Sequence, residues 1–334
     1  MGSVAGPSVT HIKMDGILNL NKPEGWTSHD VVAYVRRLTH MQRVGHAGTL
    51  DPMATGVLLV CLGRATRMVE YLMEGRKHYR AVLCLGISTD SHDADGQVTA
   101  TAPVTATKTD VERALSHYRG NIQQVPPMVS AIKRDGQPLY KLARRGIVVE
   151  RTARPVEIYE LALTDWRPPN LTIELLCSPG TYVRALARDL GKQLGCGAHL
   201  TALTRLASGS FTLSEAITLD QLAAAVSANK GDPVKTPPSP GEVPVSTANH
   251  APWWHSLVMP LDAGLKHLPA CSLGVQESRR IRSGQPLPAE LIRAPKDELC
   301  RAYAAGDTDR KLLALLKFDD EALLWRPHKV FDPL

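Results

Sequence analysis

A proline-rich stretch in the C-terminal half of the chain most strongly limits how this sequence can fold. Residues 229–252 contain six prolines in 24 positions, few large apolar side chains and little charge. Proline lacks a backbone N–H and interrupts helices and central strands, so this composition is typical of a linker. For a chain of 334 residues, we therefore expect two folded units. The expected divisions are a loose tail at 1–14, a large unit at 15–226, a linker or insertion at 227–256 and a small β-rich unit at 257–334.

The large unit has alternating strand-like and helix-like patterns. Thr27 and Asp30 have the spacing of a capping box, which predicts that a helix begins there. Thr109 and Glu112 have the same spacing and predict a second helix that ends at Gly120. A further helix is predicted over 182–194, and strands over 57–62, 77–87, 128–133, 156–163 and 171–177. Strands interrupted by helices, without strict βαβ alternation, favour an α+β fold with a mixed sheet.

Composition restricts the class of partner and the compartment. The chain has 39 Lys and Arg against 33 Asp and Glu, a net charge of +6, which favours a polyanionic partner. The six cysteines are scattered without a CxxC pair, so we expect reduced thiols in the cytoplasm. No apolar run reaches the length of a membrane span, and the first residues lack the apolar core of a secretory signal.

Residues 43–56, RVGHAGTLDPMATG, are the segment best suited to carry a reactive group. Three glycines, a proline and two threonines exclude a regular element, so we expect a structured loop that leads into a buried strand. Pro52 biases Asp51 towards an extended backbone. No Asp, Glu or Cys accompanies Asp51 in this loop, so a metal site here would need distant ligands. From the loop alone, Asp51 is either a turn-forming residue or a reactive carboxylate.

Basic residues gather between residues 133 and 154. This range contains seven Lys and Arg residues and only two acidic residues, a local net charge of +5. Either this is a solvated surface or it is an arm that contacts RNA phosphates, with Tyr140 available for stacking. The arm includes four residues that we predict to bind substrate: Lys133, Lys141, Arg144 and Arg145.

Several blocks of the sequence resemble the TruB family of tRNA pseudouridine synthases. Residues 45–58, GHAGTLDPMATGVL, resemble the active-site motif of that family, and residues 18–28, LNLNKPEGWTS, resemble its N-terminal motif. Further blocks follow in the family's order at 77–96, 126–145, 177–189 and 203–205. The resemblance weakens after Val226, and the last part of the chain only loosely resembles a PUA-like tail.

The resemblance implies a fold, a reaction and a partner. The fold is a mixed, mostly antiparallel sheet of the pseudouridine synthase type with a small β-rich, PUA-like C-terminal domain. The reaction is the isomerisation of uridine to pseudouridine at position 55 in the T-loop of tRNA. The partner is therefore the T-arm of tRNA, and no metal, organic cofactor or obligatory protein partner is expected.

The resemblance also implies catalytic roles for three residues. Breaking a glycosidic bond builds positive charge at C1′, which an adjacent carboxylate can stabilise or trap, and that carboxylate is Asp51. Arg184 pairs with Asp51 and holds it ionised. Tyr79 stacks on the target base and is a candidate for moving the C5 proton.

The remaining roles concern substrate binding and support. Tyr182 frames the same pocket and Leu203 supplies an apolar wall. His46 fills the gap left when the uridine is flipped out of its stack. Lys22 supports either the active-site loop or the RNA. One aspartate is expected in the ion network around Arg184, and Asp93 competes for that role with two neighbours, Asp90 and Asp95.

Three other functions fit parts of the sequence. A non-catalytic RNA-binding or tRNA-folding module could use the same scaffold, but the presence of Asp51, Tyr79 and Arg184 together favours an enzyme. A guide-RNA-dependent enzyme resembling dyskerin would need partner proteins, and the bacterial-looking tail argues against it. A glycosidase would need a second carboxylate in a motif-like setting, and the sequence offers none.

Overall fold

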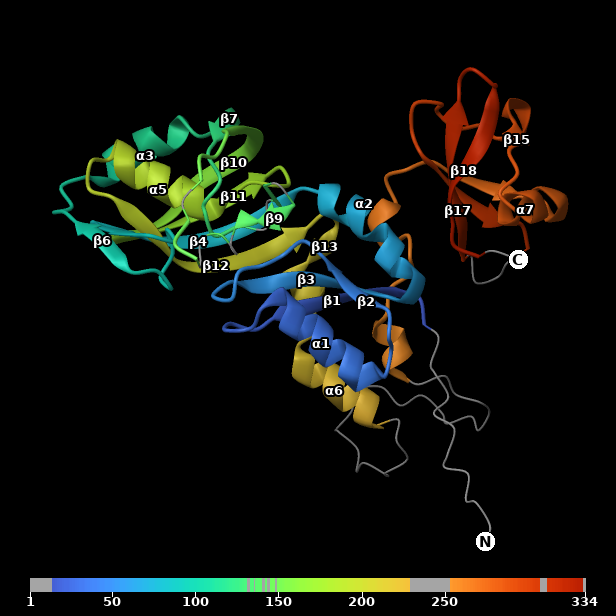
Figure 1. Cartoon of the computed structure of the whole chain (residues 1–334), viewed down its shortest axis with the longest axis horizontal. Coiled ribbons are helices and arrows are strands. Elements are labelled where there is room, and N and C mark those ends of the chain that lie inside the picture. Colours follow the sequence, from blue (N-terminus) through green and yellow to red (C-terminus); the bar gives the residue numbers. More distant parts are fainter. Residues whose placement is uncertain are drawn as a thin grey trace, which may run out of the picture.

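Two β-sheets form the framework of the computed structural model, which describes residues 14–130, 133–134, 136–139, 142, 145–147, 149–228, 253–306 and 311–332. The larger sheet has nine strands: β1 (Gly16–Lys22), β2 (Val44–Ala47), β3 (Thr55–Leu62), β4 (Lys77–Leu85), β7 (Gly120–Gln124), β10 (Arg154–Arg167), β11 (Asn170–Cys177), β12 (Ala198–Ser208) and β13 (Phe211–Thr212). Their order is β1-β3-β12-β4-β11-β10-β7, with β2 beside β3 and β13 beside β12. Figure 1 shows this sheet running through the larger part of the molecule.

The larger sheet is mixed and mostly antiparallel, as predicted. Only β3 and β12 pair in parallel, and the other strand pairs of this sheet are antiparallel. In the middle of the sheet, β4 lies between β11 and β12, so that Tyr79 is opposite Leu175 on one side and Arg205 on the other. This register brings residues from three distant parts of the sequence together.

Two pairs of helices pack beside the larger sheet. One pair is α1 (Ser28–Thr39) and α6 (Leu219–Ser227), near β1, and the other is α3 (Lys108–Ser116) and α5 (Val183–Gln193), near β10 and β12 (Figure 1). A short helix, α2 (Val69–Glu74), follows the 3₁₀ turn η1 (Gly63–Met68). Valine side chains of α1, beginning with Val31, enter the main core, which agrees with the predicted apolar face.

The cap predicted for the second helix was wrong by two residues. Thr107 is the N-cap of α3: its hydroxyl accepts from the Asp110 N–H at 3.3 Å, and its own N–H donates to the Asp110 carboxylate at 3.0 Å. Thr109 and Glu112 already lie inside the helix, because this earlier capping box supplies partners for the free backbone groups. The helix also ends earlier, at Ser116, and Gly120 begins β7.

The strand prediction for residues 128–133 was also wrong. Of the described residues in this range, 128–130 form a bend and Lys133 belongs to the two-residue strand β8 (Lys133–Arg134), which pairs with β9 (Gln137–Pro138). In the bend, the Val129 carbonyl accepts from Arg184 rather than from a neighbouring strand. The predicted strand at 77–87 is interrupted as well, because Gly86 adopts φ +85° between β4 and β5 (Ile87–Thr89). β5 pairs with β6 (Val98–Thr101).

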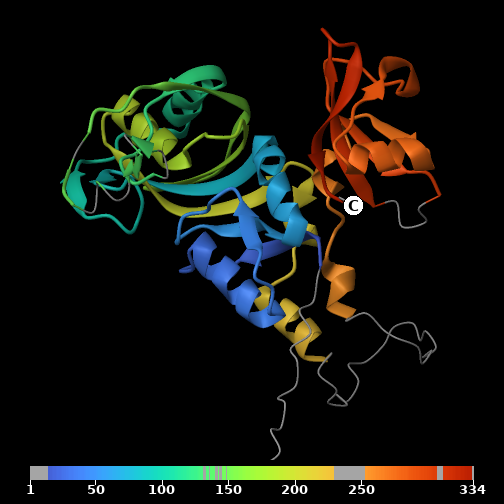
Figure 2. The same ribbon diagram turned by 45° about the vertical axis from the view of Figure 1, so that its right-hand side comes forward.

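The C-terminal unit is small and β-rich, as predicted. Its five-stranded sheet has the order β14-β16-β17-β18-β15. The bounds are β14 (Ala270–Leu273), β15 (Leu287–Pro288), β16 (Cys300–Ala304), β17 (Leu312–Asp319) and β18 (Leu324–Val330), with helix α7 (Val275–Arg282) packed beside them. Figure 2 shows this unit standing out from one end of the larger sheet.

The two units share an apolar cluster. Ile17 and Leu59 of the larger sheet belong to the same buried cluster as Leu312 and Phe331 of the smaller one. At the rim of this cluster, Arg64 forms ion pairs with Asp15 and Asp332. The C-terminal unit is therefore docked on the larger unit by both apolar and charged contacts.

The segment before the second sheet packs on the first unit. Trp254, in the 3₁₀ helix η4 (Trp253–Leu257), is buried in the main core, and Met259 pairs with Ile17 of β1. This packing favours a boundary near Pro269 over the expected one at residue 257, and we propose that later division. Residues 229–252 of the expected linker and 1–13 of the expected tail lie outside the described residues. No described helix is long and apolar enough to cross a membrane.

Candidate active site

The loop between β2 and β3 is held on both sides of Asp51. The buried Ser28 hydroxyl, at the start of α1, accepts from the Leu50 N–H at 2.9 Å and donates to the Leu50 carbonyl at 3.1 Å. On the other side, Lys22 Nζ donates to the Pro52 carbonyl at 3.1 Å. The backbone carrying Asp51 therefore has little freedom, as a precisely aimed side chain requires.

Lys22 is fully buried, and its partners are backbone carbonyls. Besides Pro52, its ammonium donates to Trp26 at 2.6 Å and to Pro23 at 2.9 Å. Burial lowers the pKa of Lys22 to about 8, although the negative charge of Asp51 opposes this shift. Of the two predicted uses of Lys22, this geometry supports the one in the active-site loop.

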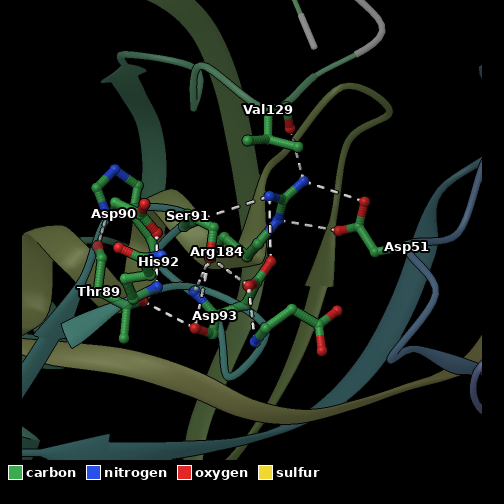
Figure 3. A network of polar contacts seen from close by, with 10 residues as sticks. Asp51, Thr89, Asp90, Ser91, His92, Asp93, Val129 and Arg184 are labelled. Carbon is green, nitrogen blue, oxygen red and sulfur yellow. Dashed lines mark hydrogen bonds and ion pairs between the residues drawn. The ribbon is translucent and has the colours of Figure 1, made fainter. Parts of the chain in front are cut away.

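Asp51 and Arg184 form a bidentate ion pair (Figure 3). Arg184 Nε lies 2.9 Å from Asp51 Oδ2, and Arg184 Nη2 lies 3.0 Å from Asp51 Oδ1. The Arg184 side chain is only 3% exposed, whereas that of Asp51 is 33% exposed. The carboxylate is thus oriented from within the protein and still faces the solvent on its other side.

The remaining donors of Arg184 are also used. Nη1 contacts Asp93 Oδ2 at 3.2 Å and the Ser91 carbonyl at 3.4 Å, and Nη2 also donates to the Val129 carbonyl at 2.8 Å. A guanidinium has five N–H groups in a fixed plane, and all three nitrogens of Arg184 have oxygen partners here. Figure 3 shows these partners surrounding the guanidinium. This arrangement leaves one orientation for Arg184 and therefore for Asp51.

Among the three aspartates considered for this network, Asp93 contacts Arg184. Its buried carboxylate also accepts from the Ser91 hydroxyl and, at 3.2 Å, from the Asp95 N–H. Asp90 instead accepts from the Gln97 N–H at 2.9 Å and belongs to the turn. The sequence did not show which of the three aspartates contacts Arg184, because all three lie within six residues of one another.

Opposing effects set the ionisation of Asp51. Burial is the largest of these and leaves the pKa of the Asp51 carboxyl above its usual value, and the nearby negative charge of Asp93 adds to the increase. The Arg184 guanidinium and the Lys22 ammonium lower the pKa of Asp51. Arg184 therefore both orients Asp51 and favours its charged form, which is the form that can stabilise a developing cation.

A cavity of about 250 Å³ opens beside Asp51. Its lining includes five of the predicted residues: Asp51, Tyr79, Tyr182, Arg184 and Leu203. Burial raises the pKa of both tyrosines, so each keeps its hydroxyl proton at neutral pH. Two rings, an aliphatic wall and one oriented carboxylate are suited to enclosing a flat, polar ring such as a nucleobase.

Gln124, which the sequence analysis missed, fixes Tyr182. Its buried side-chain amide accepts from the Tyr182 N–H at 2.8 Å and donates to the Tyr182 carbonyl at 3.0 Å. Tyr182 is the N-cap residue of α5, so this contact also fixes the start of the helix that carries Arg184. Ser28, Lys77 and Arg205 are further buried polar residues at the site that lacked an assigned role. Only their inclusion in the matched blocks could have indicated them.

The structure does not bring every predicted residue to the cavity. His46 lies on β2, where its ring packs edge-on against His29 with centroids 5.2 Å apart, and it is not part of the cavity lining. Burial lowers the pKa of His46 to about 4. Lys141 and Arg144 lie outside the described residues, as does the side chain of Lys133, and Arg145 is exposed. The described residues contain no group of three or more His, Cys, Asp or Glu side chains that could hold a metal ion.

Comparisons with known proteins agree with this geometry. The family model "TruB family pseudouridylate synthase (N terminal domain)" matches residues 36–183, and "tRNA pseudouridylate synthase B C-terminal domain" matches residues 184–266. A tRNA pseudouridine synthase B from Ralstonia nicotianae is 41% identical, over 94% of this chain and 93% of that protein. The chain belongs to the TruB family. A tRNA pseudouridine synthase B from Pseudomonas paraeruginosa is 44% identical over 85% of both chains.

The second family model continues past Val226 to residue 266, so the match includes part of the region where the sequence resemblance weakens. In three dimensions, this TruB family chain is similar to a chain of a solved Cbf5–Nop10–Gar1 complex. The TM-score is 0.71 at 26% identity, over 98% of this chain and 88% of that one. This similarity includes both the larger sheet and the C-terminal unit.

Proposed function

We propose that this protein converts uridine to pseudouridine in tRNA, at position 55 of the T-loop, with Asp51 as the catalytic carboxylate. One observation carries the proposal: the partly exposed Asp51 carboxylate is paired with the buried Arg184 at a cavity whose lining includes two tyrosines and a leucine. The relatives at 41% and 44% identity, both named tRNA pseudouridine synthase B, support tRNA as the substrate.

In the proposed reaction, the bond between N1 and C1′ breaks and a bond between C5 and C1′ forms. Positive charge develops at C1′, and the Asp51 carboxylate stabilises it because the paired Arg184 keeps that carboxylate ionised. The Tyr79 hydroxyl gives up its own proton towards solvent as its oxygen takes the C5 proton, and N1 takes up a proton from solvent. The product is an isomer of the substrate, so no oxidant, metal or organic cofactor enters the balance.

The base must leave its stack before this chemistry can occur. In the proposed complex, Tyr79 and Tyr182 contact the faces of the uracil ring, and Leu203 closes the apolar side of the cavity. His46 occupies the space that the uridine leaves in the T-loop. Extruding a base costs a few kcal/mol, which stacking on protein side chains offsets.

The basic arm at 133–154 is proposed to contact the phosphates of the T-arm. Replacing Lys141, Arg144 and Arg145 together by Gln should weaken RNA binding and flatten its salt dependence. The expected change is roughly 0.7 to 0.9 log units of slope per lost phosphate contact. Titrating the affinity for a T-arm hairpin against salt concentration measures this slope. An unchanged slope would assign the arm to the solvated surface instead.

A cytoplasmic location and action without a protein partner complete the proposal. All six cysteines are free thiols, and Cys61 and Cys177 are buried among apolar residues. Thiols of this kind persist in the reducing cytosol. Relatives that carry the tRNA enzyme's name align along nearly all of this chain, which supports a self-sufficient enzyme.

The decisive experiment is incubation of the purified protein with an unmodified tRNA transcript, followed by site-resolved detection of pseudouridine. We expect modification at position 55 without any added guide RNA or protein. A minimal T-arm hairpin should be modified equally well after the enzyme has been dialysed against a chelator. Modification that requires a guide RNA, or that occurs only at other positions, would contradict the proposal.

A further inference from the structure

Arg205 is a second buried arginine at the cavity, and it contacts both ends of the Asp51 loop. Its side chain lies on β12 and the residue is 1% exposed. Nε donates to the Val57 carbonyl at 2.7 Å, and Nη2 donates to the Gly48 carbonyl at 3.0 Å. Gly48 precedes Asp51 in the loop and Val57 follows it in β3. One guanidinium thus ties the two ends of the loop to the neighbouring strand.

The position of Arg205 is fixed by a close approach of two backbones. Gly56 pairs with Arg205 where β3 and β12 run in parallel. Gly56 has φ +98°, and a Cβ there would lie 2.3 Å from the Arg205 carbonyl oxygen. Only glycine fits both conditions. The start of β3 therefore lies directly against Arg205, which brings the guanidinium within reach of the loop.

Arg205 also carries a charge that no acidic side chain balances. Among the described residues it forms no ion pair with Asp or Glu, although it is almost completely buried. A buried cation is costly unless hydrogen bonds satisfy it, and a purely structural tie could be made by a neutral group. On the facing strand, its register partner is Tyr79 of β4, which lines the same cavity.

We propose that Arg205 is a positioning residue that couples the Asp51 loop to Tyr79, holding the Tyr79 oxygen in place and favouring release of its proton. The proposal rests on the function given above, because it assigns Tyr79 a part in moving the C5 proton. It adds a second, carbonyl-bound arginine to the residues that line the cavity with Arg184.

The groups facing Tyr79 support this role. Burial raises the pKa of the Tyr79 hydroxyl, and Cys177 on β11 and Asp51 in the loop raise it further. Arg205, which lies opposite Tyr79 on β12, opposes these effects through its charge. Lys77, on the same face of β4, directs its ammonium to the carbonyls of Met73 and Gly75 at 3.1 and 2.6 Å. Arg205 is therefore the cation that bears directly on Tyr79.

The test compares Arg205→Gln and Arg205→Lys with the native enzyme. Glutamine keeps a hydrogen-bond donor but removes the charge, and lysine keeps the charge but cannot reach both carbonyls. Ionisation of Tyr79 is followed by the near-ultraviolet absorbance of tyrosinate. Each protein is measured with and without Tyr79→Phe, so that the difference reports Tyr79 alone. Arg119→Gln is the matched control, because Arg119 also donates to a strand carbonyl, that of Leu161, and does not line the cavity.

We expect Tyr79 to titrate at least about one pH unit higher in Arg205→Gln than in the native enzyme. Its single-turnover rate on a saturating T-arm hairpin should fall by about tenfold or more, with the pH–rate profile displaced to alkaline pH. RNA affinity should stay within about threefold, because the guanidinium is buried. Arg205→Lys should react more slowly, because lysine cannot tie both ends of the Asp51 loop to β12. Its Tyr79 pKa should lie closer to the native value than in Arg205→Gln.

An unchanged Tyr79 titration and pH profile in Arg205→Gln would overturn the proposal. If that variant fails to fold, Arg205→Lys decides: native single-turnover rates in it would show that the tie between loop and strand is dispensable. A fully active Tyr79→Phe enzyme would instead contradict the proton-transfer role given to Tyr79 in the proposed function. The absorbance titration distinguishes the two failures, because it measures Tyr79 without turnover.

Discussion

Two buried arginines line one cavity, and their charges are balanced in different ways. Arg184 forms ion pairs with two carboxylates, Asp51 and Asp93, and donates to two backbone carbonyls. Arg205 faces carbonyl groups and a phenol and forms no ion pair among the described residues. A carboxylate partner gains ionisation from the arginine, whereas a carbonyl partner gains only position. In the proposed mechanism, the first arrangement favours the charged form of Asp51, and the second holds the loop that carries Asp51 and acts on Tyr79.

The largest expected effect is that of removing the carboxylate itself. Asp51→Asn keeps the shape of the side chain and loses its charge, so the single-turnover rate on a T-arm hairpin should fall by at least about 10³-fold, or about 4 kcal/mol of barrier. Folding, measured by thermal unfolding, and RNA binding should be retained. Near-native turnover by this variant would show that the Asp51–Arg184 pair takes no part in the chemical step.

Arg184→Lys tests whether the planar, forked guanidinium contributes to the reaction rate beyond its positive charge. A lysine supplies one compact charge and cannot satisfy five acceptors, so we expect a loss of roughly 10²-fold in single-turnover rate. Besides its charge, which lysine keeps, the guanidinium lowers the pKa of Asp51 by hydrogen bonding, so losing the fork should raise that pKa and move the acidic limb of the pH–rate profile to higher pH. A profile that keeps its acidic limb would contradict this assignment. The same substitution at Arg205 should leave that limb in place.

Lys22 is a third buried cation, and its hydrogen-bond partners in the described part of the chain are carbonyl groups. Its folded pKa of about 8 lies below the unfolded value of 10.5, so the unfolded chain binds more protons between those pH values. The native protein should therefore gain stability as pH rises from about 8 to about 10.5, by about 1 to 3 kcal/mol. Lys22→Met should lack this part of the rise. Denaturant unfolding of both proteins across the range measures the difference, and parallel curves would refute it.

His46, which lies outside the cavity, is expected to affect the flipping step alone. Burial keeps its imidazole neutral at pH 7, since its pKa is about 4. If it fills the space of the flipped uridine, His46→Ala should slow a folded T-loop more than an unstacked RNA, by a few kcal/mol at most. Single-turnover rates on both RNAs provide the measurement, with Asp51→Asn slowing both alike as the control. Equal losses on the two RNAs would assign His46 to the chemistry or to the loop.

Local chemistry made part of this molecule predictable. The capping box of Thr27 and Asp30 set the start of α1, and the apolar run at 57–62 became the buried part of β3. The family motifs indicated which side chains would gather at the cavity. The cap of α3 was misplaced because two Thr-x-x-acid pairs overlap there, and sequence alone does not rank them.

Tertiary contacts decided what the sequence could not. The segment at 128–130 has a strand-like composition, but its Val129 carbonyl accepts a hydrogen bond from Arg184 instead of from a neighbouring strand. The bend therefore depends on a residue far along the chain. In the same way, the roles of Gln124, Ser28 and Arg205 depend on buried backbone groups of other elements. A single polar residue in a strand or helix pattern does not identify the backbone group that it will contact.

The apolar cluster shared by the two units affects how the protein can be divided for experiments. Cutting the chain before the second sheet would uncover Ile17 and Leu59 of the catalytic unit, which the C-terminal unit helps to cover. A newly exposed apolar patch of this kind promotes aggregation. We therefore expect the catalytic unit, expressed alone, to be poorly soluble even though its active-site residues are all present. Polar replacements on that face would be needed to obtain it as a separate protein.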